Sequence, residues 1–214
     1  MPHTEVNLVL DSSQIMHTIK TLEKRIEDRF PESSLLKTCK GFIQIADHSQ
    51  DNIDYIGRAN LPIRSFTLVI ILMGLIALIY SFTLVKFKFS SMTIVDVVTL
   101  AEATINDVVL IGAAIFFLVT LEVRLKRNKA IKILDQLRGL AHVIDMHQLT
   151  KDPVMVGVIK LKTYNSPERS LSKFELQRYL DYCSEMLSLI GKVAALYSQS
   201  LPDDVIVTVV NEIE

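Results

Sequence analysis

The sequence predicts an all-α membrane protein, in which a two-helix transmembrane hairpin is flanked by segments that pack into a cytoplasmic helical bundle or coiled coil. Residues 65–85 form a run of 21 residues without a charge, and about 20 apolar residues are enough to cross a hydrocarbon core about 30 Å thick. A second apolar run ends at Glu122. In both flanks apolar residues recur at intervals of three and four, which is typical of helices that bury one face.

Composition narrows the class of protein further. Half of the 214 residues are hydrophobic and the net charge is −1, so no basic field favours a nucleic-acid partner. Seven glycines and six prolines exclude fibrous and low-complexity classes. Cys39 and Cys183 lie far apart without a CxxC motif, which predicts reduced, buried thiols in a cytosolic compartment.

The positions of the two apolar runs and of the stripes that flank them divide the chain into five predicted segments. Residues 1–61 form an N-terminal cytoplasmic helical hairpin, 62–86 the first transmembrane helix, 87–94 a short outer connector, 95–123 the second transmembrane helix and 124–214 a C-terminal cytoplasmic helical region. Ser12 or Ser13 is expected to cap the first helix and Ser33 or Ser34 the second. Their apolar stripes consist of Ile15, Ile19, Leu22, Ile26 and Phe30, and of Leu35, Cys39, Phe42, Ala46, Ser49, Ile53 and Ile56.

The second transmembrane helix contains acidic residues. Its uncharged run, residues 108–121, would extend only about 21 Å at about 1.5 Å per residue, which is too short to cross a membrane. The span must therefore reach back over Asp107 and Asn106 towards Glu102. In one interpretation these side chains are solvated at the outer headgroup boundary. In the other, an oligomer arranges Glu102, Asn106 and Asp107 along a cation path.

Basic residues follow the second span directly. They are Arg124, Lys126, Arg127, Lys129 and Lys132. By the positive-inside rule they place both termini in the cytoplasm and the connector outside. This membrane-surface cluster is either a topology signal alone or also a binding site for anionic lipid headgroups.

Beyond the membrane the helix is expected to continue to about Met146. His142, Asp145 and His147 near its end are residue types that bind zinc or another transition metal. On a helix His147 points away from the other two, so all three can converge on a metal only if the helix ends between them.

The most regular pattern lies near the C-terminus. Ser172 and Glu175 have the spacing of a capping box, and the residues that follow keep a strict alternation of four and three. Its members are Leu176, Leu180, Cys183, Leu187, Ile190, Ala194, Tyr197 and Leu201. Residues 203–214 are ambiguous between helix and strand, as are residues 154–163. The sequence stops within an amphipathic pattern, as expected if the natural chain continues.

Residues 141–153 (AHVIDMHQLTKDP) and 179–214 resemble segments of an uncharacterised family of bacterial two-span membrane proteins. The architecture is also similar to two-span effector domains of bacterial conflict systems, and loosely to the calcium uniporter. The acidic DxxE motif of the uniporter is absent, because Asp96 and Glu102 are six residues apart. The resemblance implies a bacterial inner membrane location and carries over no activity and no functional residue.

These patterns predict a function without catalysis. No Gly-rich phosphate loop, nucleophile elbow or complete metal site is found in the sequence, so neither an enzyme nor a cofactor is expected. We expect a membrane-anchored helical scaffold or interaction protein, a homo-oligomer in the lipid bilayer with a cytoplasmic protein partner. The alternative is an oligomeric channel or pore-type effector.

Overall fold

The computed structural model describes residues 9–84, 93–149, 151 and 171–213. Every element in this part of the chain is a helix, which confirms the all-helical prediction for it. The elements are α1 (Ser12–Arg29), α2 (Ser34–Gly57), α3 (Leu61–Leu84), α4 (Ile94–Leu149), α5 (Lys173–Ser200) and α6 (Asp204–Asn211). Most of the connector at 87–94 and the ambiguous segment 154–163 lie outside the described residues.

The chain divides into two compact units. The first, here called the bundle, consists of Met1–Gly57 and Arg127–Glu214; the second, the hairpin, is Arg58–Lys126. Both segments that flank the hairpin therefore fold into one unit, although they are separated by the whole of the hairpin in the sequence.

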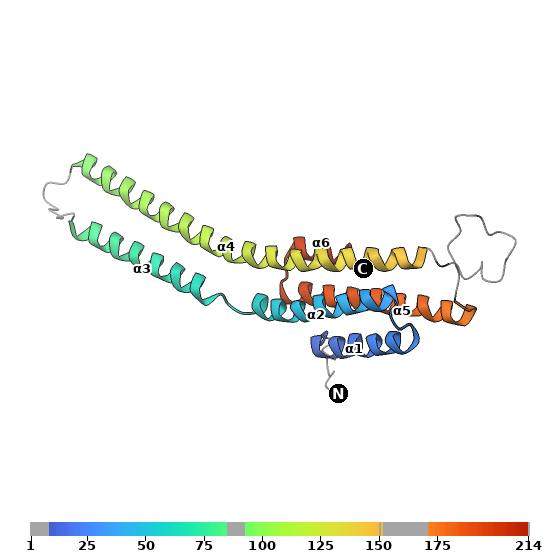
Figure 1. The fold of residues 1–214 in the computed structure, drawn as a ribbon. Coiled ribbons are helices and arrows are strands. Elements are labelled where there is room, and N and C mark those ends of the chain that lie inside the picture. The colour runs from blue at the N-terminus through green and yellow to red at the C-terminus, as the bar shows by residue number, and fades with distance from the viewer. Residues whose placement is uncertain (1–8, 85–92, 150, 152–170, 214) are drawn as a thin grey trace, which may run out of the picture. The chain divides into compact units, whose positions relative to one another are not determined.

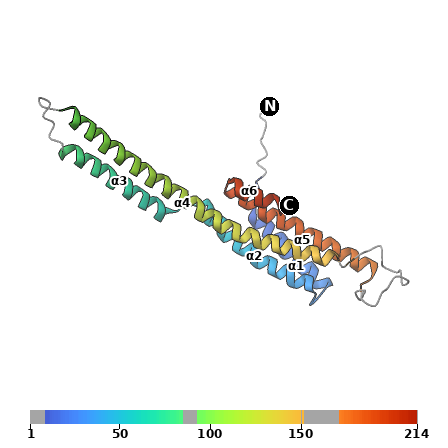
Figure 2. The ribbon, with the colours of Figure 1, turned by 90° about the horizontal axis from the view of Figure 1, so that it is seen from above.

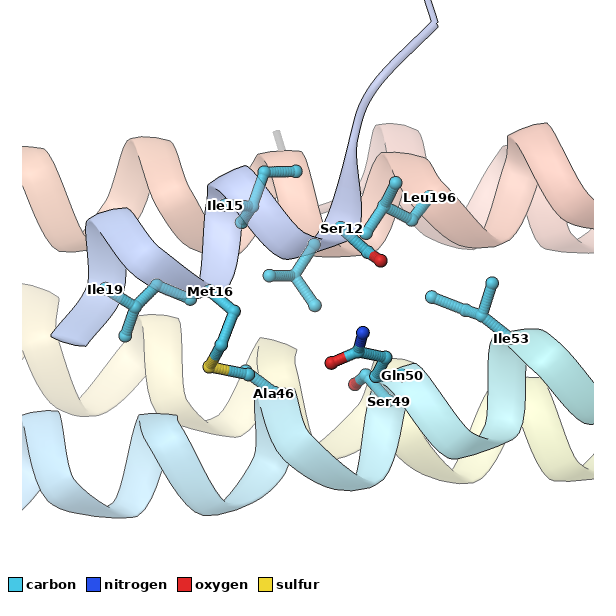
Figure 3. Close-up of a pocket in the computed structure, with 10 residues that line it drawn as sticks. Ser12, Ile15, Met16, Ile19, Ala46, Ser49, Gln50, Ile53 and Leu196 are labelled. Atoms are coloured by element: carbon cyan, nitrogen blue, oxygen red, sulfur yellow. The ribbon is translucent and has the colours of Figure 1, made fainter.

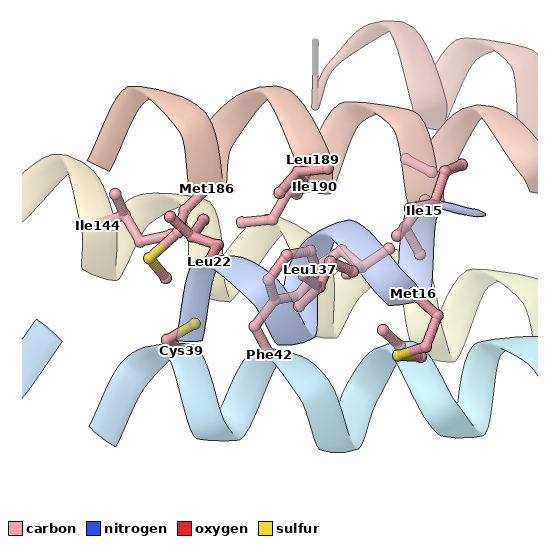
Figure 4. Close-up of a cluster of buried hydrophobic side chains, with 14 of the residues drawn as sticks. Ile15, Met16, Leu22, Cys39, Phe42, Leu137, Ile144, Met186, Leu189 and Ile190 are labelled. Carbon is pink, nitrogen blue, oxygen red and sulfur yellow. The ribbon is translucent and has the colours of Figure 1, made fainter. Parts of the chain in front are cut away.

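The bundle packs α1, α2, α5, α6 and the C-terminal part of α4 side by side (Figures 1 and 2). Their apolar stripes meet in a single core, part of which is drawn in Figure 4. Ile19, Phe42, Leu137 and Ile190 are fully buried there. Each amphipathic helix thus buries its stripe against helices of the same chain, which removes apolar surface from water without a second copy.

The ends of the bundle helices follow the expected capping chemistry with one correction. The N-cap of α1 is Asp11, whose carboxylate accepts hydrogen bonds from the backbone N–H groups of Ser13 and Gln14. The expectation of Ser12 or Ser13 as the cap is therefore wrong; a carboxylate is an equally good cap and complements the helix dipole. The capping box of Ser172 and Glu175 at the start of α5 is confirmed.

In the hairpin, α3 and the N-terminal part of α4 lie side by side (Figures 1 and 2). α3 has 24 residues and so extends about 36 Å at about 1.5 Å per residue. The two helices approach closely at Gly74, where a Cβ atom would lie 2.9 Å from Cδ1 of Ile111. Glycine at this position therefore lets α3 lie directly against α4.

Large apolar side chains cover the outside of the hairpin. Ile76 in α3 is 64% exposed and Phe116 in α4 is 74% exposed. Among the described residues, two helices are long and apolar enough to cross a membrane by length and composition. The second of them, α4, is one helix of 56 residues, in agreement with the predicted continuation beyond the second span.

Candidate functional site

The polar residues predicted in the second span all lie on α4 within the hairpin. Glu102 and Asn106 are exposed, whereas Asp107 is half-buried. Asp107 belongs to the stripe that faces α3, together with Ile111 and the buried Leu118. Glu102 and Asn106 are one helical turn apart on another face. One chain therefore does not bring the three side chains together into a single site.

A second polar group in the hairpin, centred on Glu122, joins α4 to the start of α3. Glu122 accepts a hydrogen bond at 3.2 Å from the backbone N–H of Asn60, and its carboxylate lies 3.1 Å from Nζ of Lys126 and 3.5 Å from Nε of Arg64. Lys126 Nζ also donates to the backbone carbonyl of Arg58 at 2.8 Å. The carboxylate thus satisfies backbone and side-chain donors at the N-terminus of α3, where a negative charge is favourable.

The sequence does not predict this group, because Glu122 comes at the end of an apolar run and marks only the boundary of the predicted second span. Its partners Asn60 and Arg64 lie about 60 residues earlier in the chain. The one local signal is the i,i+4 spacing of Glu122 and Lys126, which favours an ion pair on a helix.

The five basic residues after the second span have different environments. Within the hairpin, Lys126 is buried against Glu122 and Arg124 is exposed. Within the bundle, Arg127 pairs with Asp203 and Lys129 Nζ lies 3.6 Å from the centre of the Tyr55 ring. Lys132 is exposed. Arg124 and Lys132 are therefore the two whose charges are directed to solvent.

His142, Asp145 and His147 do not converge. α4 continues through Leu149, so the helix does not end between them, which was the condition for a shared metal ion. His142 and Asp145 are exposed, and the half-buried His147 has its Nε2 3.4 Å from the hydroxyl of Thr38. In the described parts of the chain no three His, Cys, Asp or Glu side chains are placed to hold a metal ion.

Burial and the nearby Lys151 charge lower the pKa of His147 below its usual value, because both disfavour the imidazolium. Cys39 and Cys183 are buried in the bundle core, and burial raises the pKa of each thiol to about 12. Almost no thiolate is present at neutral pH, so neither cysteine has the chemistry of a nucleophile.

A small pocket opens between α1, α2 and α5 of the bundle (Figure 3). Its polar lining residues are Ser12, Ser49 and Gln50, and the remainder of its lining is apolar. It has room for about one water molecule. A pocket of this size fits structural water and is too small for a metabolite.

The chain matches no protein-family model, and comparisons with curated proteins and with solved structures find no similar protein. The resemblance to bacterial two-span membrane proteins therefore stays a prediction.

Proposed function

We propose that the chain is an integral membrane protein whose hairpin spans the bilayer and whose bundle is a cytoplasmic scaffold for another protein. The observation that carries this proposal is the contrast between the surfaces of the two units. The hairpin exposes large apolar side chains on both helices, such as Ile76 and Phe116, whereas the bundle helices bury their apolar stripes. A continuous apolar surface of this kind is unfavourable in water and favourable in lipid.

The proposed orientation rests on the basic residues near the ends of the spans. Arg124 and Lys132 are exposed at and beyond the end of the second span, and positive charges of this kind stay on the cytoplasmic side during insertion. Both ends of the hairpin lead into the bundle, so both termini of the chain would lie in the cytoplasm.

Binding of a protein fits the bundle better than binding of a small molecule. The pocket between α1, α2 and α5 accommodates about one water, and the exposed surfaces of α1, α2 and α5 are rich in charged residues. Rigid helical surfaces with charged faces are typical of protein–protein contacts that are selected by electrostatic complementarity.

Site-specific photo-crosslinking in cells tests the scaffold proposal. A photoreactive amino acid at exposed bundle positions Lys24, Asp47 and Lys192 is expected to give an adduct of one reproducible mass with a second protein. The matched control is the same amino acid at Phe116 of the hairpin, which is expected to give no such adduct. If every bundle position yields only adducts of the chain with itself, the scaffold proposal is wrong.

Topology is tested separately with a membrane-impermeant maleimide, since both native cysteines are buried. In intact cells Lys88→Cys in the connector is expected to react. Lys132→Cys, which is exposed in the bundle, is expected to react only after the membrane is permeabilised. The reverse pattern would invert the orientation. Extraction of the protein by alkaline carbonate would contradict membrane insertion itself.

A second candidate function is cation conduction, and the polar residues of α4 favour it. Glu102, Asn106 and Asp107 lie within the second apolar helix, where polar groups are costly unless they line a water-filled path or contact protein. Ion flux through reconstituted protein that is reduced severalfold in Glu102→Gln or Asp107→Asn would support conduction. Flux that is absent, or unchanged in both variants, would exclude it.

A further inference from the structure

α4 carries a second regular stripe within the hairpin, on a face that α3 does not cover. It is called the Asn106 stripe here. Its members are Thr99, Ala103, Asn106, Leu110, Ala113, Phe117 and Thr120, and their spacing alternates strictly between four and three. All are exposed except the half-buried Thr120. The residues that face α3, such as Ile111 and Leu118, come one position later, which places them about 100° around the helix.

We propose that the Asn106 stripe is the surface through which two copies of the chain associate in the membrane. The inference rests on the proposal that the hairpin spans the bilayer, and it assigns the surface of self-association. Because every copy inserts with the same topology, α4 of one copy runs parallel to α4 of the other. A two-fold axis along the membrane normal then brings Asn106 against Asn106 of the second copy.

A second copy satisfies the chemistry of the stripe, whereas lipid does not. A side-chain amide has both donors and an acceptor, so two asparagines related by a two-fold axis are complementary to each other. Against lipid, the exposed amide of Asn106 would have no hydrogen-bond partner in the hydrocarbon.

The other members of the stripe suit close packing of two helices. Ala103 and Ala113 are small and flank Asn106 and Leu110 along the stripe, and small residues let transmembrane helices approach each other. The bundle needs no second copy, since its stripes are buried within one chain. The heptad stripe that remains available for self-association therefore lies on the hairpin.

The register of the two α4 helices also predicts where Glu102 and Asp107 lie in the dimer. In heptad notation Ala103 is a core a position and Asn106 is a core d position of the stripe. Glu102 directly precedes Ala103 and is therefore a g residue. Asp107 directly follows Asn106 and is therefore an e residue. In a parallel pair a g residue faces the e residue five positions later on the other helix. Glu102 of one copy is thus close to Asp107 of the second copy, and two carboxylates at this distance repel each other.

Disulfide crosslinking in native membranes tests the surface. Ala103→Cys, Leu110→Cys and Phe117→Cys are expected to form dimers on mild oxidation. Ile105→Cys and Val119→Cys are the matched controls, because both are exposed on the same helix but lie about 100° or more from the stripe. The unaltered chain is the background control, since its two cysteines are buried. Crosslinking of the control positions as efficiently as the stripe positions would overturn the proposal.

The strength of association gives a second, independent measurement. Asn106→Val is expected to weaken dimerisation about three- to tenfold in energy-transfer measurements in vesicles, as expected for loss of one interhelical hydrogen bond. Glu102→Gln is expected to strengthen it by relieving the repulsion across copies. Tighter association of Asn106→Val, or weaker association of Glu102→Gln, would show that the register is wrong.

Failure of this inference differs from failure of the proposed function. A protein that resists carbonate extraction but shows no stripe-specific crosslinks would retain its place in the membrane and lose the assigned surface. A protein that carbonate extracts would lose both.

Discussion

Arg127 of α4 donates two hydrogen bonds to one carboxylate oxygen of Asp203, at 3.0 Å from Nε and 2.5 Å from Nη2. The Asp203 side chain is only 9% exposed. The same carboxylate caps α6, because its other oxygen accepts a hydrogen bond from the backbone N–H of Val205 at 3.1 Å. One side chain in the bundle therefore joins α4 to the start of α6.

Asp203→Ala is expected to lower the free energy of unfolding of the bundle by about 2–4 kcal/mol. It removes a helix cap and two charge-assisted hydrogen bonds, and it leaves the partly buried guanidinium of Arg127 unpaired. Chemical denaturation of the full chain in detergent, followed by circular dichroism, measures the loss.

Glu185→Ala is the matched control for that experiment. Glu185 pairs with Arg25 at 2.8 Å, but the two side chains are 39% and 42% exposed. Exposed ion pairs contribute about 0–1 kcal/mol, so this variant is expected to remain close to the unaltered chain. Equal losses in both variants would show that the Asp203 carboxylate has no special role.

The Asp203 carboxyl also predicts a dependence of stability on pH. Its burial opposes ionisation, but the hydrogen bond and the charge of Arg127 outweigh this effect and hold the pKa of Asp203 below its usual value. A carboxyl with a lowered pKa in the folded state stabilises the fold at pH values above its unfolded pKa of about 4, and this contribution is lost as the pH falls through the folded pKa.

The difference in unfolding free energy between the unaltered chain and Asp203→Asn is therefore expected to be constant above about pH 5 and to shrink below about pH 4. Denaturation midpoints across this range measure it. A difference that grows as the pH falls would mean that the pKa of Asp203 is raised in the folded protein.

The close approach of Gly74 to Ile111 makes the hairpin sensitive to one methyl group. A Cβ atom at position 74 would lie 2.9 Å from both Cγ1 and Cδ1 of Ile111, so Gly74→Ala forces the two helices apart or Ile111 into another rotamer. Overpacking of this kind costs about 1–3 kcal/mol. Thermal unfolding of the full chain in detergent is expected to show the loss, and Ile111→Ala in the same chain is expected to restore much of it.

Gly112→Ala is the control for Gly74→Ala, because a Cβ atom at position 112 meets no atom within 4 Å apart from its chain neighbours and the adjacent backbone of its own helix. Alanine has the higher helix propensity, so this variant is expected to be unchanged or slightly more stable. If both glycine variants behave alike, Gly74 does not mark the contact between the helices.

Much of the fold is predictable from the sequence because apolar residues recur at helical spacing within each segment. Ile15, Ile19, Leu22 and Ile26 recur at helical spacing, and all four are buried in the bundle. The continuity of α4 through the second span follows from the same rule. Such patterns depend only on the geometry of one helix, so no knowledge of its neighbours is needed.

Contacts between distant residues were not predictable in this way. Arg127 and Asp203 are 76 residues apart, and Asn60 and Glu122 are 62 apart. The sequence placed Arg127 in a membrane-surface cluster, since its partner in α6 leaves no signal next to it. The sequence does not predict the surroundings of Glu102 either, because they depend on what covers this exposed face of α4.

Two leucine truncations distinguish a protein core from a lipid-facing surface. Leu134 is fully buried in the bundle, whereas Leu75 of α3 is 53% exposed on the hairpin. Leu134→Ala is expected to lower the free energy of unfolding by about 2–5 kcal/mol, because it removes buried apolar contacts and leaves a cavity. Leu75→Ala is expected to cost less than about 1 kcal/mol, since lipid or detergent fills the space that the side chain leaves. Denaturation of both variants in the same detergent makes the comparison. A loss of several kcal/mol in Leu75→Ala would mean that this face of α3 packs against protein, and that lipid does not cover it.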